Sequence, residues 1–178
     1  MLRRTMYAAL FAVPALLSAQ GAMGAGQDAM KKDAMKDRKA MMAPHQMAHG
    51  AINTNADGVA IKGYDPVAYF TASAATPGSA TYTASHQGAL FRFASAANRD
   101  AFMAAPEKYT PQYGGYCAMG VAVGRKFDID PAAFKVEDGK LYLNKDKAAQ
   151  AVWLKDAPGN IRKANGKWSE VAQRKLDG

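Results

Sequence analysis

The sequence predicts a small single α+β domain, with two β-hairpins and several short helices, after a signal peptide and a disordered tail. Three observations predict this organisation: two pairs of alternating apolar segments around short turns, capping residues before helical segments, and an abrupt change of composition near residue 51. Hairpins followed by helices indicate an α+β fold rather than a parallel sheet of repeated βαβ units.

The first 24 residues are interpreted as a signal peptide. Arg3 and Arg4 precede an apolar stretch of about a dozen residues, Met6 to Leu17, which is short for a membrane span. Small residues follow from Ser18 to Gly26, where more than one cleavage position is compatible with the sequence. An uncleaved membrane anchor is the alternative. We expect cleavage, and therefore a periplasmic or secreted protein with no stable membrane anchor.

Residues 25–51 are predicted to be a disordered tail rich in methionine, histidine and lysine, because they lack aromatic residues and a periodic apolar face. Five methionines and two histidines stand between residues 30 and 49: Met30, Met35, Met41, Met42, His45, Met47 and His49. Thioether and imidazole ligands suit copper(I) better than hard cations, which makes His45, Met47 and His49 candidate metal ligands. The alternative is a low-complexity linker in which methionine is merely tolerated.

Residues 52–170 are predicted to form the folded domain, followed by a C-terminal tail at 171–178. A short strand is expected at 59–61, with a turn at 63–66. The first hairpin should pair 81–83 with 90–93, whose alternation places Phe91 and Phe93 on one face.

Capping residues and turn residues define the remaining elements of the domain. Ser95 is a predicted N-cap for a helix over 96–105, which Pro106 should end. Asp138-Gly139 predicts a second hairpin between 134–137 and 140–143. Asp146 should cap a helix over 147–155 with Val152 and Trp153 facing inward. Pro158-Gly159 should end this helix, a short helix should follow at 160–164, and Trp168 should pack back on the core.

The charge of the chain argues against a nucleic-acid partner. The formal net charge is +8 and falls to +6 when the two arginines of the signal peptide are removed. The basic residues are spread along the chain rather than clustered in a stripe, so a solvated basic face is the expected reading.

Cys117 is the only cysteine of the chain and follows Gly114-Gly115 in an aromatic and glycine-rich segment. In an oxidising compartment it is a free thiol, an intermolecular disulfide partner, a metal ligand or a buried small hydrophobe. A helix beginning near Tyr116 would lower the pKa of the thiol. Together with Met119 and His86, the only histidine of the domain, Cys117 would make a soft copper site.

Tyrosines crowd the same segments and suggest a ligand cleft. We expect Cys117 at the floor of a small cleft near Tyr64 and Tyr116, with Asp65 at its rim. Tyr64, Asp65, Gln112, Tyr113 and Tyr116 are its candidate lining residues. The alternative is that these tyrosines are core and rim residues whose hydroxyl groups bond to the backbone.

Several segments of the domain resemble the exported bacterial branch of the YHS domain family. They are residues 59–70, 93–95, 106–109, 111–118, 138–144 and Trp168. The resemblance implies a small α+β domain similar to cysteine-containing metal-binding modules of heavy-metal transporters and sensors. Copper binding is often suspected for such proteins, and no general activity is established. This chain departs from the multi-cysteine modules because it has one cysteine.

These observations lead to two hypotheses of different classes. The first is an exported, non-enzymatic, metal-associated protein that binds copper or another soft heavy metal and works with a metal transporter or another periplasmic protein. The alternative is a thiol-based redox or small-molecule enzyme centred on Cys117. Since the sequence contains no Gly-x-Ser-x-Gly, P-loop, dinucleotide fingerprint or His-Glu-x-x-His motif, the first hypothesis is favoured.

Overall fold

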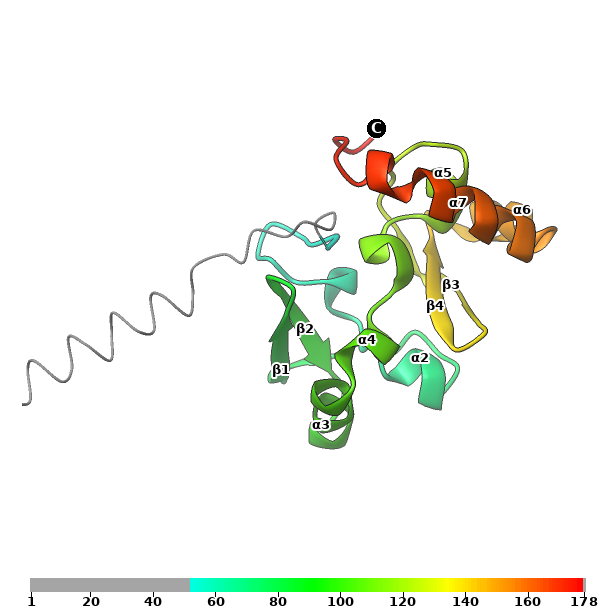
Figure 1. Ribbon diagram of the computed structural model, residues 1–178. Coiled ribbons are helices and arrows are strands. Elements are labelled where there is room, and N and C mark those ends of the chain that lie inside the picture. Colours follow the sequence, from blue (N-terminus) through cyan, green and yellow to red (C-terminus); the bar gives the residue numbers. More distant parts are fainter. Residues whose placement is uncertain (1–51, 178) are drawn as a thin grey trace, which may run out of the picture. The chain divides into compact units, whose positions relative to one another are not determined.

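The computed structural model describes residues 52–177, so the predicted signal peptide and tail lie outside the described residues (Figure 1). The elements in chain order are η1 (Ile61–Gly63), α2 (Ala68–Thr71), β1 (Ser79–His86), β2 (Ala89–Phe93), α3 (Ala96–Ala104), α4 (Pro106–Tyr109), η2 (Gln112–Gly115), α5 (Ala118–Ala122), β3 (Asp130–Glu137), β4 (Lys140–Asn144), α6 (Lys147–Leu154) and α7 (Ala157–Val171). The predicted α+β class is confirmed.

Both hairpins form as predicted, each as a separate antiparallel two-stranded sheet. Their turns place two consecutive residues at positive φ: Gln87 at 48° with Gly88 at 75°, and Asp138 at 48° with Gly139 at 69°. This backbone matches the right-handed twist of the strands, which explains the tight two-residue connections. In β2 the expected alternation holds, and Phe91 is fully buried.

Both predicted N-caps are confirmed. The Ser95 side chain accepts a hydrogen bond from the Asn98 N–H at 3.1 Å, and the Asp146 carboxylate accepts one from the Ala149 N–H at 2.7 Å. Each cap satisfies an N–H group that the first turn of the helix leaves without a partner.

The segment after β4 differs from the prediction. Pro158 and Gly159 lie in the first turn of α7, where proline is tolerated because its missing N–H has no helical partner in any case. The helix predicted at 160–164 is therefore one part of a fifteen-residue helix. Val152 is 47% exposed and does not face inward, whereas Trp153 is fully buried.

Two boundaries also differ from the prediction. Pro106 ends α3 but begins the single turn of α4. The folded part continues past residue 170, because the buried Lys126 ammonium group donates to the carbonyls of Ala172 and Arg174, and the Asp177 N–H donates to the Lys126 carbonyl.

The two hairpin–helix segments are copies of one backbone pattern. In β1–β2 the pairs run from Ser79–Phe93 to His86–Ala89, and in β3–β4 from Asp130–Asn144 to Glu137–Lys140, each residue lying 51 positions further along the chain. Both hairpins carry their irregularity at the same place, after the first pair. The caps Ser95 and Asp146 keep the same spacing.

The repeat extends into the segments before the hairpins. Ile61, Lys62 and Gly63 have φ values of 50°, 53° and 85°, and residues 113–115 repeat these values at 55°, 60° and 78°. A left-handed φ is rare for residues other than glycine, such as Ile61, Lys62 and Tyr113, so the recurrence of the run 52 positions later is a strong sign of a duplicated unit. We call residues 61–104 the first unit and residues 112–154 the second unit.

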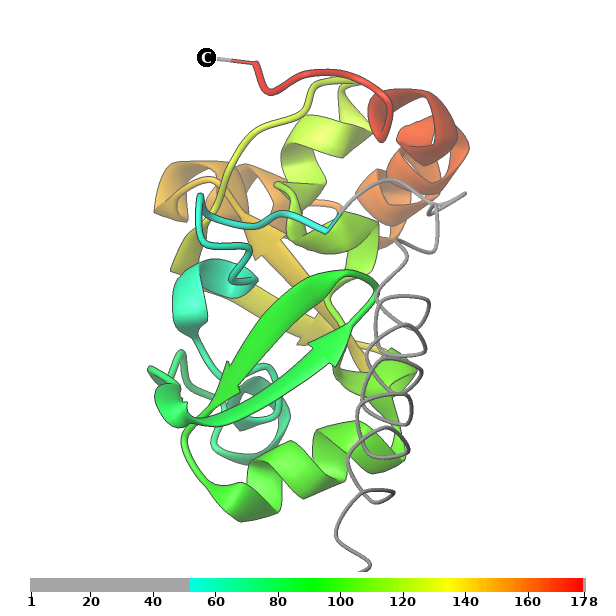
Figure 2. The same ribbon diagram turned by 90° about the vertical axis from the view of Figure 1, so that its left-hand side faces the viewer.

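The two units share one core, which contains Phe91, Phe93 and Phe102 of the first unit and Leu141 and Leu143 of the second. A second cluster joins Trp153 to the inner face of α7, through residues that include Ala164 and Val171. Figures 1 and 2 show α3 and α7 at opposite ends of the domain. The second unit is therefore covered by a helix that lies outside the repeat.

Candidate functional site

Cys117 is the N-cap residue of the short helix α5 and is only 1% exposed. Its sulfur accepts a hydrogen bond from the Gly120 N–H at 3.3 Å, and its thiol points to Asn144 Oδ1 at 3.9 Å. Its own N–H donates to the Phe127 carbonyl at 3.1 Å. Cys117 thus forms hydrogen bonds with three different segments of the second unit.

The pKa of the Cys117 thiol is raised, contrary to the prediction from its place before a helix. Burial is the largest cause, and hydrogen bonds from the N–H groups of Gly120, Lys145 and Met119 lower the pKa without cancelling that effect. Desolvation penalises the thiolate, and a helix as short as α5 does not compensate for it. The thiol therefore stays largely protonated at neutral pH.

Asn144 is a component of this site that the sequence analysis missed. It lies at the end of β4 and is fully buried. Its Oδ1 accepts a hydrogen bond from the Met119 N–H at 3.2 Å and faces the Cys117 thiol, while its Nδ2 has no hydrogen-bond partner within residues 52–177. A buried donor without a partner is costly, and it marks this site as incompletely satisfied.

Asp65 occupies the equivalent position in the first unit, 52 residues before Cys117. The Asp65 N–H donates to the Thr76 carbonyl at 2.9 Å, just as the Cys117 N–H donates to Phe127. The sequence carries a weak signal of this equivalence, because Gly63-Tyr64-Asp65 parallels Gly115-Tyr116-Cys117. A two-residue match was not enough to detect the repeat without the backbone.

Asp65 is not at the rim of a cleft, as expected from the sequence, but fully buried. Its carboxylate accepts hydrogen bonds from the N–H groups of Val67 at 2.8 Å, Ala68 at 3.3 Å and Ala94 at 2.8 Å, and from Asn98 Nδ2 at 2.6 Å. A buried carboxylate requires such donors, which also tie the start of α2 to the residue after β2. Its role in the structure is therefore to hold segments together.

The structure gives His86 and Cys117 different partners. The His86 ring packs against Phe91 and Phe102, and its Nε2 lies 3.4 Å from Glu107 Oε1 without hydrogen-bond geometry. Met119 is partly buried between the two core clusters. Across residues 52–177, no three or more His, Cys, Asp or Glu side chains are grouped to hold a metal ion. His45, Met47 and His49 lie outside the described residues.

The fold separates the residues that were predicted to line one ligand cleft. Gln112 and Tyr113 line a polar pocket of about 150 Å³ that Trp168 and Glu107 also border, but Tyr64, Asp65, Tyr116 and Cys117 are not among its lining residues. The Tyr113 hydroxyl donates to Asn165 Oδ1 at 2.9 Å, and burial raises its pKa.

The remaining tyrosines of the predicted cleft have structural contacts. Tyr116 lies 6.3 Å from the Trp168 ring and 4.3 Å from the Lys126 ammonium group, and burial raises its pKa. Tyr64 packs against the core. Trp168 packs back on the core as predicted, 5.9 Å from the Tyr113 ring. These contacts favour the alternative that most of these tyrosines are core and rim residues.

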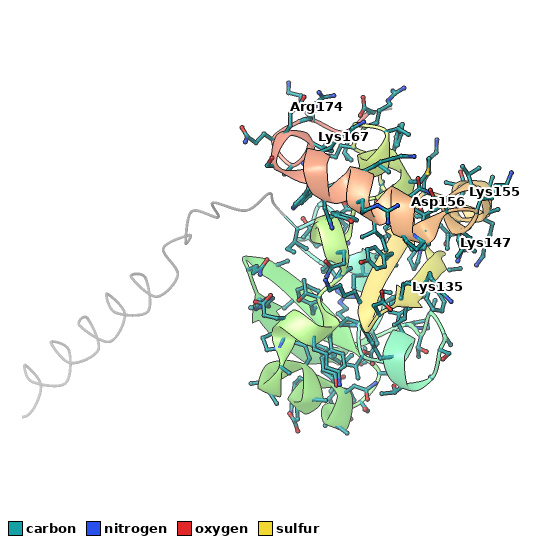
Figure 3. All side chains as sticks on the ribbon, turned by 45° about the vertical axis from the view of Figure 1, so that its right-hand side comes forward. Lys135, Lys147, Lys155, Asp156, Lys167 and Arg174 are labelled. Carbon is teal, nitrogen blue, oxygen red and sulfur yellow. The ribbon has the colours of Figure 1, made fainter. Side chains whose placement is uncertain are left out.

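The positive charge of the domain gathers in its second half. Residues 52–110 contain four basic and four acidic residues, whereas residues 111–177 contain twelve basic and eight acidic residues. Figure 3 shows Lys135, Lys147, Lys155, Lys167 and Arg174 projecting outward around β3, α6, α7 and the C-terminal segment. Acidic residues such as Asp156 stand among them, so this surface is mixed in sign.

Comparisons of the chain with protein-family models, curated protein sequences and solved structures return no match. The resemblance to the YHS domain family therefore rests on the segments quoted above. Among the helices in residues 52–177, none has the length and apolar character needed to cross a membrane.

Proposed function

We propose that the chain is an exported, non-enzymatic protein that binds copper or another soft heavy metal, mainly through the methionines and histidines of residues 30–49. The observation that carries this proposal is the concentration of seven thioether and imidazole side chains in that segment of the sequence. Several soft ligands on one segment raise the local ligand concentration that a metal ion meets.

The arrangement of the domain supports assigning metal capture to this segment. Cys117 would have to lose its proton to bind a metal ion, and burial opposes both the loss of the proton and the approach of the ion. His86 has other partners than Cys117, so these residues with Met119 would form a site only after rearrangement. The resemblance to the YHS domain family is compatible with this assignment.

The test is a copper(I) titration of the full mature chain against a competing chelator. In one variant, leucine replaces Met30, Met35, Met41, Met42 and Met47, which keeps length and apolar character and removes the sulfur atoms. We expect this variant to lose most of its copper(I) stoichiometry. The matched control is Met103→Leu in α3, where a methionine that is 63% exposed should be replaced without effect.

A Cys117→Ser variant completes the titration. If it loses as much copper(I) as the five-leucine variant, the metal is held by the domain and the assignment to the tail is wrong. If all variants bind like the parent chain, neither sulfur-bearing segment is a metal site. Rapid alkylation of Cys117 by iodoacetamide at neutral pH would instead favour the thiol enzyme, for which a buried thiol with a raised pKa is poorly suited.

A further inference from the structure

We propose that Cys117 is a site of oxidative modification, and that its sulfinate form is held by the same set of donors that holds the Asp65 carboxylate in the first unit. This inference does not depend on metal binding by the tail. It rests on the duplicated backbone and on a buried donor that the reduced form of the site leaves without a partner.

The Asp65 site shows what this backbone accommodates. Two oxygen atoms on one carbon, one bond beyond Cβ, receive three backbone N–H groups and the Asn98 side-chain amide at 2.6–3.3 Å. A cysteine sulfinate has the same branching: two oxygen atoms on one sulfur, also one bond beyond Cβ, with a negative charge shared between them. The two groups therefore need similar donors in similar places.

Three of the four donors are conserved in the second unit. Met119 and Gly120 stand two and three residues after Cys117, as Val67 and Ala68 stand after Asp65. Lys145 is the first residue after β4, as Ala94 is the first after β2. The Gly120 N–H donates to the Cys117 sulfur at 3.3 Å, and the N–H groups of Lys145 and Met119 lie near enough to lower the pKa of the thiol. In the reduced form the Met119 N–H donates to Asn144 Oδ1. The backbone thus directs donors from two segments at one side chain.

The fourth donor is Asn144 Nδ2. Asn144 is fully buried, its amide faces the Cys117 sulfur through Oδ1 at 3.9 Å, and its Nδ2 lacks a partner within the described part of the chain. In the first unit the fourth donor is also an asparagine Nδ2, that of Asn98, although it comes from α3. In the reduced form Oδ1 faces the sulfur, so a half-turn of the Asn144 amide would bring Nδ2 to the oxygen atoms added to the sulfur and give it the acceptor that it lacks.

The chemistry requires hydrogen peroxide as oxidant. The Cys117 thiolate attacks one peroxide oxygen, the S–O bond forms as the O–O bond breaks, and the released hydroxide takes the sulfenic proton to give sulfenate and water. A second hydrogen peroxide molecule reacts in the same way to give sulfinate and water. Sulfur loses two electrons in each step, and each peroxide gains two. Because the thiol is buried and largely protonated, we expect slow reaction.

The first experiment exposes the full mature chain to hydrogen peroxide and follows Cys117 by peptide mass spectrometry. We expect Cys117 to gain two oxygen atoms and stop there, with an unfolding temperature equal to or above that of the reduced protein. Exposed Met103 serves as the internal control for peroxide exposure. Because the buried thiol should react more slowly than exposed Met103, exposure is continued well beyond complete oxidation of Met103. Cys117 that still stays reduced, or oxidation that lowers the unfolding temperature, would overturn the proposal.

The second experiment replaces the oxidation by a mutation. Cys117→Asp should fold, with an unfolding temperature close to that of the parent chain, because the aspartate takes the place of the sulfinate. Val121→Asp is the matched control, since Val121 is as deeply buried as Cys117 but lies within α5 in a hydrophobic cluster. It should unfold the domain. If both variants unfold, the second unit does not accept an anion at Cys117.

A double-mutant cycle tests whether Asn144 binds the anion at position 117 or whether the site merely tolerates an aspartate there. Asn144→Ala should reduce the folding equilibrium constant at least about tenfold more in the Cys117→Asp background than in the parent chain, because only there does Nδ2 have an acceptor to lose. Equal effects in the two backgrounds would show that Asn144 does not bind the anion.

Discussion

The first and second units have one backbone but differ in the side chain at their most buried polar position. In the first unit, Asp65 uses four donors and leaves none of them without a partner. In the second unit, Cys117 engages the equivalent backbone donors weakly, and Asn144 Nδ2 stays without a partner in the described residues. The comparison teaches that one duplicated backbone can surround a carboxylate in one copy and a thiol in the other, and that the side chain decides how completely the donors are satisfied.

The units differ in their surroundings as well. The first unit belongs to a half of the domain with balanced charge, and the second belongs to a half with four excess positive charges. Only the second unit packs against α7, which buries Trp153 and contacts Tyr113. The second unit is therefore covered by a helix that lies outside the repeat, and it belongs to the positively charged half of the domain.

The largest expected effect comes from breaking the Asp65 site. Asp65→Asn turns one acceptor into an NH₂ group that faces donors, so that about two buried donors lose their partner. We expect the free energy of unfolding to fall by roughly 2–4 kcal/mol, as measured by urea denaturation. Asp57→Asn is the matched control, because Asp57 is exposed. Equal effects of the two substitutions would mean that the Asp65 hydrogen bonds contribute little.

The next largest effect is expected in the pH dependence of the unfolding free energy that Cys117 causes. Because burial raises its pKa in the folded state, the native protein holds the thiol proton more tightly than the unfolded chain. The stabilisation is complete below the unfolded pKa of about 8.5 and is lost as the pH rises toward the folded value. Relative to Cys117→Ser, the unfolding free energy should fall by up to about 1.4 kcal/mol per pH unit.

The measurement compares wild type with Cys117→Ser between about pH 7 and 9.5, below the range in which ordinary tyrosines titrate. Tyr69, Tyr113, Tyr116 and Tyr142 all have raised pKa values and are present in both proteins, so their contributions cancel in the difference. Parallel pH profiles would show that the thiol has the same pKa in the folded and unfolded chains.

The smallest expected effect concerns the two turns. Gln87 and Asp138 both have a φ of 48°, a conformation that asparagine and aspartate adopt more readily than glutamine. Gln87→Asn should raise the unfolding free energy by a few tenths to about 1 kcal/mol. Asp138→Asn should change it little, because that turn already has a suitable residue. Both are measured by urea denaturation, and a loss in the first variant would contradict the expectation.

Sequence reasoning located the hairpins, the caps and α6 correctly but not the start and length of α7. Asp138-Gly139 and Ser95 act on residues within about four positions, so their effect is visible in a short segment. The Pro158-Gly159 pair is ambiguous in the sequence, because proline is common after the end of one helix and also in the first turn of the next. Val152 was misplaced because the elements packed against α6, which are β3, β4, α5 and α7, decide which of its faces is covered.

The candidate site was predicted less well than the fold. Cys117 was identified because it is unique, and its burial was one of the four alternatives. Its pKa direction was wrong because desolvation depends on the segments packed around it. Asn144 ends the quoted segment 138–144 but was not recognised as a site residue, and Asn98 belongs to no quoted segment. Both were missed because their partners lie 27 and 33 positions away, respectively.

The sequence by itself determined the fold class, the turns and the helix caps of this protein, because these depend on local backbone preferences and on the alternation of apolar residues. Only the tertiary structure decided that Asp65 is buried, that His86 and Cys117 have different partners, and that the chain repeats one unit. Polar groups 27 to 33 residues away contact Asp65 and Cys117, and no local backbone preference determines these contacts. The chemistry of both sites depends on these long-range contacts, because burial and hydrogen-bond donors set the free-energy cost of a charge.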